Sequence, residues 1–278
     1  MKKKRRPPPP EKLVADEGPS PGGVGETVAH RLERCIERLE DPELAAGWVV
    51  HEVRKDLKRV RALLRLSGDE LPTRRLEKRC AAAARKLSHL RDNAVLGETL
   101  ARLRARADAR ERKALDAVID SLAEDDAAAP QLPRPVALEV ADALRKVRND
   151  CASLSFERMD ATALDAGLAN SWSDTAIAFR QVVDDPVTAR FHDFRKAVKR
   201  ELHQRELSDR PLDPAERSIL KKLADVLGEL QDLTVLRERL RAEGLWRGPV
   251  RTLTRRTMRE LKARTLRLGM GRYPEGES

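Results

Sequence analysis

The sequence predicts an all-α protein that consists of two related helical bundles. After residue 26, apolar residues recur with a period near 3.6 along almost the whole chain. No segment shows the sustained two-residue alternation of β-branched residues that is typical of strands. Motifs of the first half also return in the second half, in the same order and at nearly the same spacing, which indicates an internal duplication.

Helix breakers divide the helical pattern into nine expected helices. The breaks are DP at Asp41 and Pro42, followed by SGDELP, QLPRP, DDP, DRPLDP and RGP further along the chain. Proline ends a helix because it lacks the backbone N–H and clashes with the preceding turn. The expected helices cover residues 26–40, 43–66, 72–106, 108–124, 134–156, 161–183, 187–207, 213–243 and 249–268.

The start of the chain is predicted to be a disordered tail. It combines the basic run KKKRR, a run of four prolines and the stretch PSPGGVGE, none of which supplies a buried apolar face. The domain organisation that we expect is a basic and proline-rich tail over 1–26, a first bundle over 27–158, a second bundle over 159–270 and a C-terminal tail over 271–278.

Two pairs of motifs define the repeat. HEVRKDLKR begins at His51 and HDFRKAVKR begins at His192, and both fit the pattern H-x-x-R-K-x-x-K-R. LSHLRDNAVLGETL begins at Leu87 and LGELQDLTVLRERL begins at Leu227, and both fit L-x-x-L-x-D-x-x-V-L-x-E-x-L. Both pairs are separated by about 140 residues, so chance resemblance is a poor explanation.

The first histidine motif predicts an amphipathic helix with one strongly cationic side. At 100° per residue, Val53, Leu57 and Val60 fall on one side and the cations fall on the other. The acidic residues of this helix, Glu52 and Asp56, are too few to neutralise the cations. We call the cationic side the first basic face; it comprises His51, Arg54, Lys55, Lys58, Arg61 and Arg65.

The second motif repeats this arrangement over a shorter length. Phe194 and Val198 lie behind the cations, and Leu202 stands where the first repeat has Arg61. The second basic face comprises His192, Arg195, Lys196, Lys199 and Arg200.

Five polar identities on one helical side favour binding of an oligoanion. A single basic helix face is usually only a solvated surface, but packing does not explain why both copies keep the charged side. Arginine offers forked donors to phosphate oxygens, lysine offers mobile point charges, and histidine donates from a ring nitrogen. The two faces therefore predict contacts with a phosphate chain.

Composition narrows the classes of partner. Lys and Arg number 56 and Asp and Glu number 46, and the resulting formal charge of +10 favours an anionic partner. Only 3% of residues are aromatic, so the chain has few platforms for stacking single-stranded bases. No stretch approaches the roughly 18 apolar residues of a membrane span, and no hydrophobic segment follows the basic start. We expect a cytoplasmic protein that does not contact membranes.

The sequence lacks a recognisable catalytic or metal-binding signature. It contains no glycine-rich phosphate loop, no H-E-x-x-H motif and no acidic metal cluster. The cysteines Cys35, Cys80 and Cys151 are far apart and lack C-x-x-C spacing, so we expect buried, reduced thiols. We expect no enzymatic activity, no metal and no cofactor.

These motifs resemble the CHAD family, the conserved histidine α-helical domain. HEVRKDLKRVRALLRL, HDFRKAVKR, HLRDNAVL and LGELQDLTVL carry the resemblance, which covers about residues 27 to 268. It implies two four-helix bundles related by a pseudo-twofold axis, whose basic surfaces together bind long-chain inorganic polyphosphate. Family members are associated with polyphosphate granules, and many have no catalytic activity of their own.

The resemblance also assigns individual residues to polyphosphate binding. By position in the motifs, these are His51, Arg54, Lys58, Arg59, Arg61 and Arg65 in the first half and His192, Arg195, Lys199 and Arg200 in the second half. Leu202 departs from the pattern, which puts one contact of the second half in doubt.

The leading hypothesis is a non-catalytic, cytoplasmic protein that binds inorganic polyphosphate at polyphosphate granules. The second hypothesis is binding of nucleic acid through the same basic surface. A polyphosphate-processing or phosphotransfer enzyme and a protein-interaction scaffold are further alternatives.

Overall fold

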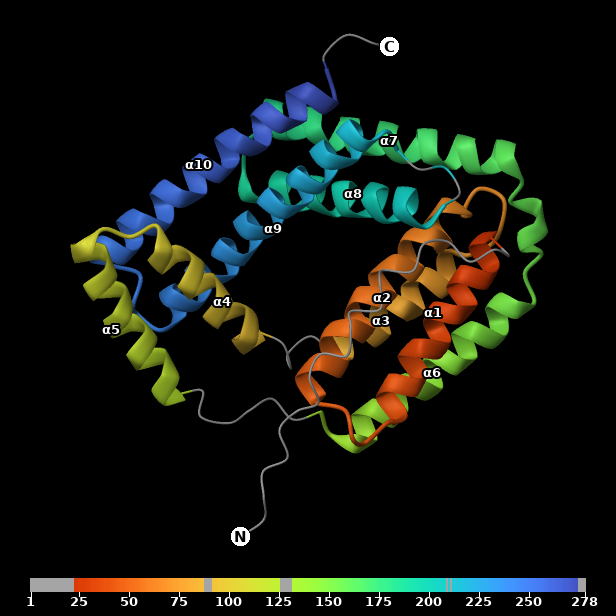
Figure 1. Cartoon of the computed structure of the whole chain (residues 1–278), viewed down its shortest axis with the longest axis horizontal. Coiled ribbons are helices and arrows are strands. Elements are labelled where there is room, and N and C mark those ends of the chain that lie inside the picture. Colours follow the sequence, from red (N-terminus) through yellow and green to blue (C-terminus); the bar gives the residue numbers. More distant parts are fainter. Residues whose placement is uncertain (1–22, 88–91, 126–131, 209, 211, 275–278) are drawn as a thin grey trace. The chain divides into compact units, whose positions relative to one another are not determined.

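The computed structural model describes residues 23–87, 92–125, 132–208, 210 and 212–274, and over these residues the protein is all-α (Figure 1). This confirms the predicted fold class. The helices are α1 (Gly23–Glu40), α2 (Ala46–Leu66), α3 (Arg74–Lys86), α4 (Asp92–Ala105), α5 (Ala109–Asp125), α6 (Arg134–Ala152), the 3₁₀ turn η1 (Phe156–Arg158), α7 (Ala161–Asp184), α8 (Thr188–Leu207), α9 (Pro214–Ala242) and α10 (Gly248–Arg272).

Most observed helices follow the expected ones to within a few residues, with four differences. The helix α10 ends at Arg272, four residues beyond the expected end at 268 and inside the predicted C-terminal tail. The helix expected over 72–106 is interrupted, because α3 ends at Lys86 and Leu87 is its C-terminal cap. The helix expected over 134–156 ends at Ala152. The helix α1 begins at Gly23, inside the predicted tail 1–26. Residues 1–22 and 275–278 of the two predicted tails lie outside the described residues.

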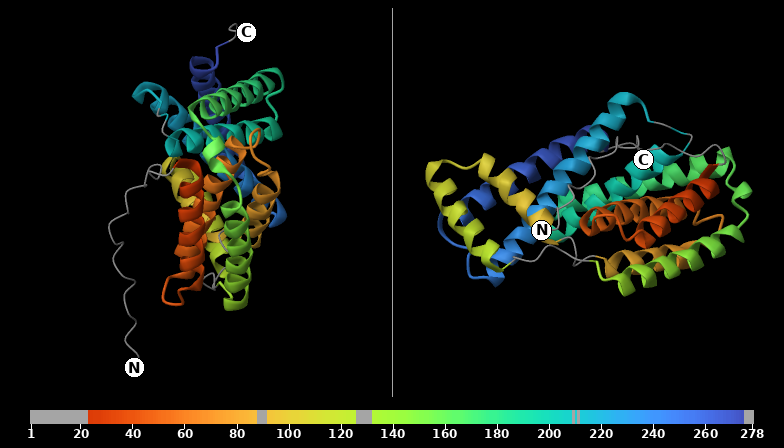
Figure 2. Two further views of the ribbon diagram at one scale, coloured as in Figure 1. Left: turned by 90° about the vertical axis from the view of Figure 1, so that its right-hand side faces the viewer. Right: turned by 60° about the horizontal axis from the view of Figure 1, so that its bottom comes forward.

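The chain divides into two compact units. Unit 1 contains α1, α2, α3 and α6, with the first turns of α7 and the last turn of α8. Its four complete helices lie side by side (Figures 1 and 2), and each packs against two others: α1 and α3 both contact α2 and α6. Leu32, Leu57 and Leu144 are fully buried between them. Burial of each such side chain contributes about 1.5–3 kcal/mol.

Unit 2 contains α4, α5, α9, α10 and the greater part of α7 and α8. The helix α9 packs along α10, and α5 packs on α10. An aromatic cluster lies where α7, α8 and the end of α10 meet. The ring centroids of Phe179 and Phe194 are 5.4 Å apart, and the ring centroid of Tyr273 lies 6.0 Å from that of Phe179 and 6.1 Å from that of Phe194. Gly269 is needed beside Phe179, because a Cβ atom there would overlap the ring.

The two units group the helices differently from the sequence halves. The helices α4 and α5 precede residue 158, yet they pack with α9 and α10 of unit 2. An ion pair explains part of this grouping: Arg256 of α10 donates to both carboxylate oxygens of Glu111 of α5, at 3.0 and 2.9 Å. The predicted pair of four-helix bundles with pseudo-twofold symmetry, and its domain boundaries, stay predictions.

Each unit holds one buried carboxylate on the helix that carries a histidine motif. Asp56 of α2 accepts from Arg31 at 2.8 Å and from Arg38 at 2.6 Å, both on α1, and its side chain is 2% exposed. Glu201 of α8 accepts from Arg272 at 3.1 Å and from the Tyr273 hydroxyl at 2.8 Å. A buried charge is tolerated only when it is paired, so each carboxylate fixes the rotation of its helix.

We expect Asp56→Asn to lower the free energy of unfolding of unit 1 by about 3–5 kcal/mol, because it removes the buried carboxylate that pairs with the nearly buried guanidinium of Arg31. The matched control is Glu52→Gln, which removes a carboxylate from the partly exposed side of the same helix. Urea unfolding followed by circular dichroism measures both variants. Equal stability of the two would contradict the structural role of Asp56.

All three cysteines are buried and free, as the sequence predicts. Burial raises the pKa of Cys80 to about 12 and that of Cys151 to about 11, and it also raises the pKa of Cys35. A thiol with a pKa near 11 is thiolate in only about one molecule in a thousand at pH 8.

We therefore expect all three thiols to react slowly with a thiol reagent at pH 8 in the native protein, at least about a hundredfold more slowly than in denaturant. The measurement is the time course of labelling with and without denaturant. Rapid stoichiometric labelling of the native protein would show that the cysteines are accessible.

Candidate anion-binding faces

The helix α2 presents the first basic face outward, because its opposite side is buried. Val53, Leu57 and Val60 are 0% exposed, which confirms the predicted apolar stripe. His51 and Arg65 are exposed, with side-chain exposures of 49% and 52%. The remaining members of the face, Arg54, Lys55, Lys58 and Arg61, are half-buried.

Carboxylates offset part of the charge at both ends of this face. Near its start, Glu52 lies 3.7 Å from Nε2 of His51 and 3.8 Å from Nζ of Lys55. Near its end, Glu77 of α3 lies 3.3 Å from a guanidinium nitrogen of Arg61 and 3.9 Å from one of Arg65. These side chains are partly exposed, so each pair is weak and open to competition from another anion.

Arg54 is oriented by the neighbouring helix. Its guanidinium donates to the carbonyl of Ala84 in α3 at 3.0 Å. This bond holds the stem of the side chain against α3 near the middle of the first basic face. A positioned guanidinium loses less rotamer freedom when an anion binds.

Arg59 lies with the interior ion pairs rather than on the outward surface. The residue is 5% exposed, and its guanidinium lies 3.7 Å from Asp56. Asp56 likewise faces α1, so it does not offset the charge of the first basic face as the sequence suggested. Both residues lie between the polar and apolar sides of α2. At such positions the neighbouring helix, and not the angle around α2, decides whether a side chain is buried.

The second basic face is built in the same way on α8. Phe194 and Val198 are 0% exposed behind it, as predicted. Lys196 is exposed and lies 3.1 Å from Asp193, and Arg200 donates to Asp174 of α7 at 2.9 Å. Arg195 and Lys199 are half-buried.

His192 is the most closely positioned member of this face. Its Nδ1 lies 2.6 Å from Oε1 of Gln231 in α9. An amide oxygen only accepts, so Nδ1 donates and the neutral ring keeps its lone pair on Nε2. On protonation, Nε2 becomes a second donor and the ring gains a charge that suits a phosphate oxygen.

The second basic face ends after Arg200. Leu202 is 8% exposed and belongs to the core of unit 2, and Glu201 is fully buried. A cation at either position would have to enter the core. The shorter second face is therefore a consequence of packing in unit 2.

Two residues beside His192 were not found from the motifs. Gln231 orients the imidazole, and Lys262 of α10 lines the same small cleft between α8, α9 and α10. Gln231 lies inside the repeated leucine motif, at a position where the two copies of the motif differ. Lys262 lies on a helix that the repeated histidine motif does not include.

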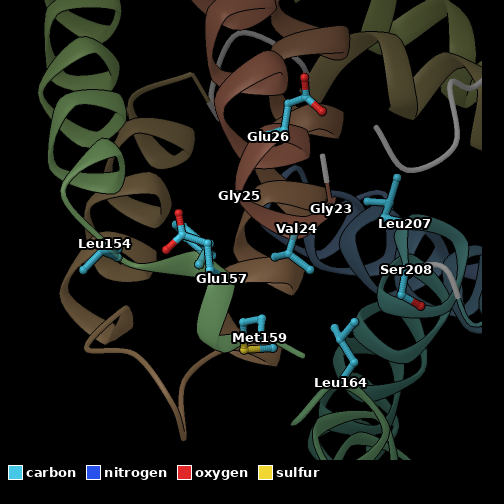
Figure 3. Close-up of a pocket in the computed structure, with 11 residues that line it drawn as sticks. Gly23, Val24, Gly25, Glu26, Leu154, Glu157, Met159, Leu164, Leu207 and Ser208 are labelled. Carbon is cyan, nitrogen blue, oxygen red and sulfur yellow. The ribbon is translucent and has the colours of Figure 1, made fainter. Parts of the chain in front are cut away.

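A pocket of about 350 Å³ lies elsewhere in unit 1, at the start of α1 (Figure 3). Val24, Met159 and Leu164 contribute apolar side chains to it, and Glu26 and Glu157 also line it. None of the described residues that line it is a lysine, arginine or histidine. The pocket therefore has a different chemistry from the two basic faces.

Over the described part of the chain, no three histidine, cysteine or acidic side chains gather as a metal site would require. Within the same residues, none of the helices has the length and apolar character needed to cross a bilayer.

Comparison with known proteins gives one match. A family model described as CHAD domain matches residues 30–241 of the chain, which include both histidine motifs. No curated protein and no solved structure matches the chain.

Proposed function

The chain belongs to the CHAD-domain family, and on this premise we propose that it binds inorganic polyphosphate through its two basic faces. The family is associated with polyphosphate binding, and the matched segment contains every residue of both faces.

The first basic face is the observation that supports this proposal most directly. Six basic side chains occupy one side of α2 between residues 51 and 65, a rise of about 21 Å along the axis. Like charges three and four residues apart repel each other, and Glu52 and Glu77 offset only part of that charge. A linear anion lying along α2 would relieve the repulsion at every turn.

The second basic face supports a phosphate ligand through the geometry of one residue. Gln231 fixes the ring of His192, so that Nε2 is the nitrogen that faces a ligand and, in the protonated ring, donates to a phosphate oxygen. A ring that is held before binding loses little entropy on binding. Orientation of this kind is expected of a contact residue and is not needed for a merely solvated surface.

Inorganic polyphosphate fits the composition of the faces better than nucleic acid does. Both faces are made of cations without interleaved aromatic side chains, so they offer charge and hydrogen bonds but no stacking. Inorganic polyphosphate presents phosphate oxygens along its whole length and has no bases. Duplex DNA is the appropriate competitor in a test, because it presents a regular array of phosphates.

The proposal includes two further expectations about the cellular role. We expect the protein to associate with polyphosphate granules and to leave the bound chain intact. Incubation of the protein with polyphosphate and magnesium, followed by assay of phosphate release and chain length, tests the second expectation. Chain shortening would favour a polyphosphate-processing enzyme.

We expect His51→Ala and His192→Ala each to weaken binding of long-chain polyphosphate by about fivefold, because each removes an imidazole ring that, when protonated, donates a hydrogen bond to an anionic oxygen. The double variant should lose about the product of the two effects. Binding is measured at physiological salt, with duplex DNA titrated in parallel.

The matched control is His30→Ala, which removes an exposed imidazole from α1. Its polyphosphate affinity should equal that of the unchanged protein. Equal affinity for polyphosphate and duplex DNA, unaltered by the histidine changes, would contradict the proposed function and favour a generally basic surface.

We expect Glu77→Gln to strengthen polyphosphate binding by about threefold, because the carboxylate competes with the ligand for Arg61 and Arg65. Glu37→Gln, an exposed position on α1, adds the same charge to unit 1 away from α2 and serves as control. An equal gain in both variants would mean that only net charge matters and that the two arginines have no special part.

A further inference from the structure

The helix α10 carries a row of cations that the repeated motifs do not include. Arg251, Arg255, Arg259 and Lys262 are spaced by four, four and three residues, so they fall within about 80° of one another around the helix. They extend over about 17 Å along its axis. The three arginines are exposed and Lys262 is half-buried. We call these four residues the α10 row.

Acidic residues are absent from this side of α10. Glu260 is the single acidic residue of the helix, and it lies about 100° or more from each member of the row. The neighbouring Glu111 of α5 is held by Arg256, which lies about 60° or more around the helix from each member of the row. Over the described residues, no hydrogen bond or ion pair engages the side chains of Arg251, Arg255 and Arg259.

The corresponding helix of the first half shows a different balance of charge. Aligning the Pro-Val openings of α6 and α10 places Arg145 opposite Arg259 and Arg148 opposite Lys262. Arg145 pairs with Glu40, and Arg148 pairs with Glu33, both on α1. Unit 1 thus neutralises these positions with carboxylates, whereas unit 2 leaves the α10 row uncompensated.

Lys262 joins the α10 row to the second basic face. Its ammonium group donates to the carbonyl of Pro186 at 2.9 Å and lies 4.9 Å from the ring centroid of Phe191. Lys262 and His192 line the same cleft. The volume of this cleft, about 10 Å³, has room for roughly one water molecule. His192 and Lys262 therefore stand at one cleft of unit 2, where a phosphate chain bound at His192 has a second cation beside it.

Arg237 of α9 increases the positive potential at this junction. Burial lowers the pKa of Lys262, and the nearby guanidinium of Arg237 lowers it further. The Nε of Arg237 is buried, and none of the described residues accepts a hydrogen bond from it. An anionic oxygen near Lys262 would relieve the repulsion between these two cations.

We propose that the α10 row is a third phosphate-binding element, which continues the path of the polyphosphate chain from His192 along α10 in unit 2. This inference rests on the proposed function and extends it to a helix that lies beyond residues 30–241, the segment matched by the family model. Because the row is long, it contributes to binding of long chains and not of short ones.

The test compares two double variants of α10 that remove the same charge. Arg255→Gln with Arg259→Gln alters the row, and Arg264→Gln with Arg267→Gln removes two exposed arginines from the other side of the helix. Affinity for long-chain polyphosphate and for tripolyphosphate is measured over a range of salt concentrations. Circular dichroism establishes that both variants keep their helix content.

The row variant should bind long-chain polyphosphate about tenfold more weakly, and the slope of log affinity against log salt should fall by about two, one for each lost phosphate contact. The control variant should change the affinity by less than about twofold, because its arginines make no contact with the chain. Affinity for tripolyphosphate should be the same for the two variants.

The outcomes separate this inference from the proposed function. Equal long-chain affinity of the two variants, with the effect of His51→Ala and His192→Ala intact, would overturn the α10 row and leave the proposed function standing. If the row variant lost as much affinity for tripolyphosphate as for long-chain polyphosphate, the extension of the path along α10 would be overturned. No binding of long-chain polyphosphate by the unchanged protein would overturn both.

Discussion

The paired carboxylate of Asp56 is the constraint on which the first basic face depends. A carboxylate that is 2% exposed must be paired, and the two arginines that pair with it both come from α1. Their position sets the rotation of α2 about its own axis. With this rotation, the cations on the opposite side of α2 face outward. This interior charge cluster and the buried apolar stripe of α2 together orient the cationic side of the helix outward.

Unit 2 reaches the same result with different residues. Ala197 occupies the repeat position of Asp56, and the buried carboxylate lies one turn later, at Glu201, where Arg272 and Tyr273 bind it. Aromatic rings of α7, α8 and the end of α10 fill the remaining space. The two halves of the chain therefore share their outward cations and differ in the interior contacts that position them. This pattern is expected if the outward side, and not the interior, is the part under selection.

The location of the carboxylates decides which cations are available to a ligand. Acidic residues of α1 form ion pairs with arginines of α6, and Glu77 of α3 partly offsets the positive charge at the end of the first basic face. No carboxylate takes up the α10 row among the described residues. A net charge of +10 says only that cations are in excess. Where that excess collects is a property of each packed unit, and it differs between the two units.

The sequence by itself determined the all-α fold, most helix ends, the repeat and the outward cations of α2 and α8, because apolar period and helix breakers act locally along the chain. It did not show that Asp56 and Arg59 are buried, since residues between the two sides of a helix are buried or exposed according to the neighbouring helix. It also missed Gln231 and Lys262, and it did not foresee that α4 and α5 pack with α9 and α10. Only the tertiary structure brings these side chains to their partners, because each contact joins helices that are distant in the sequence.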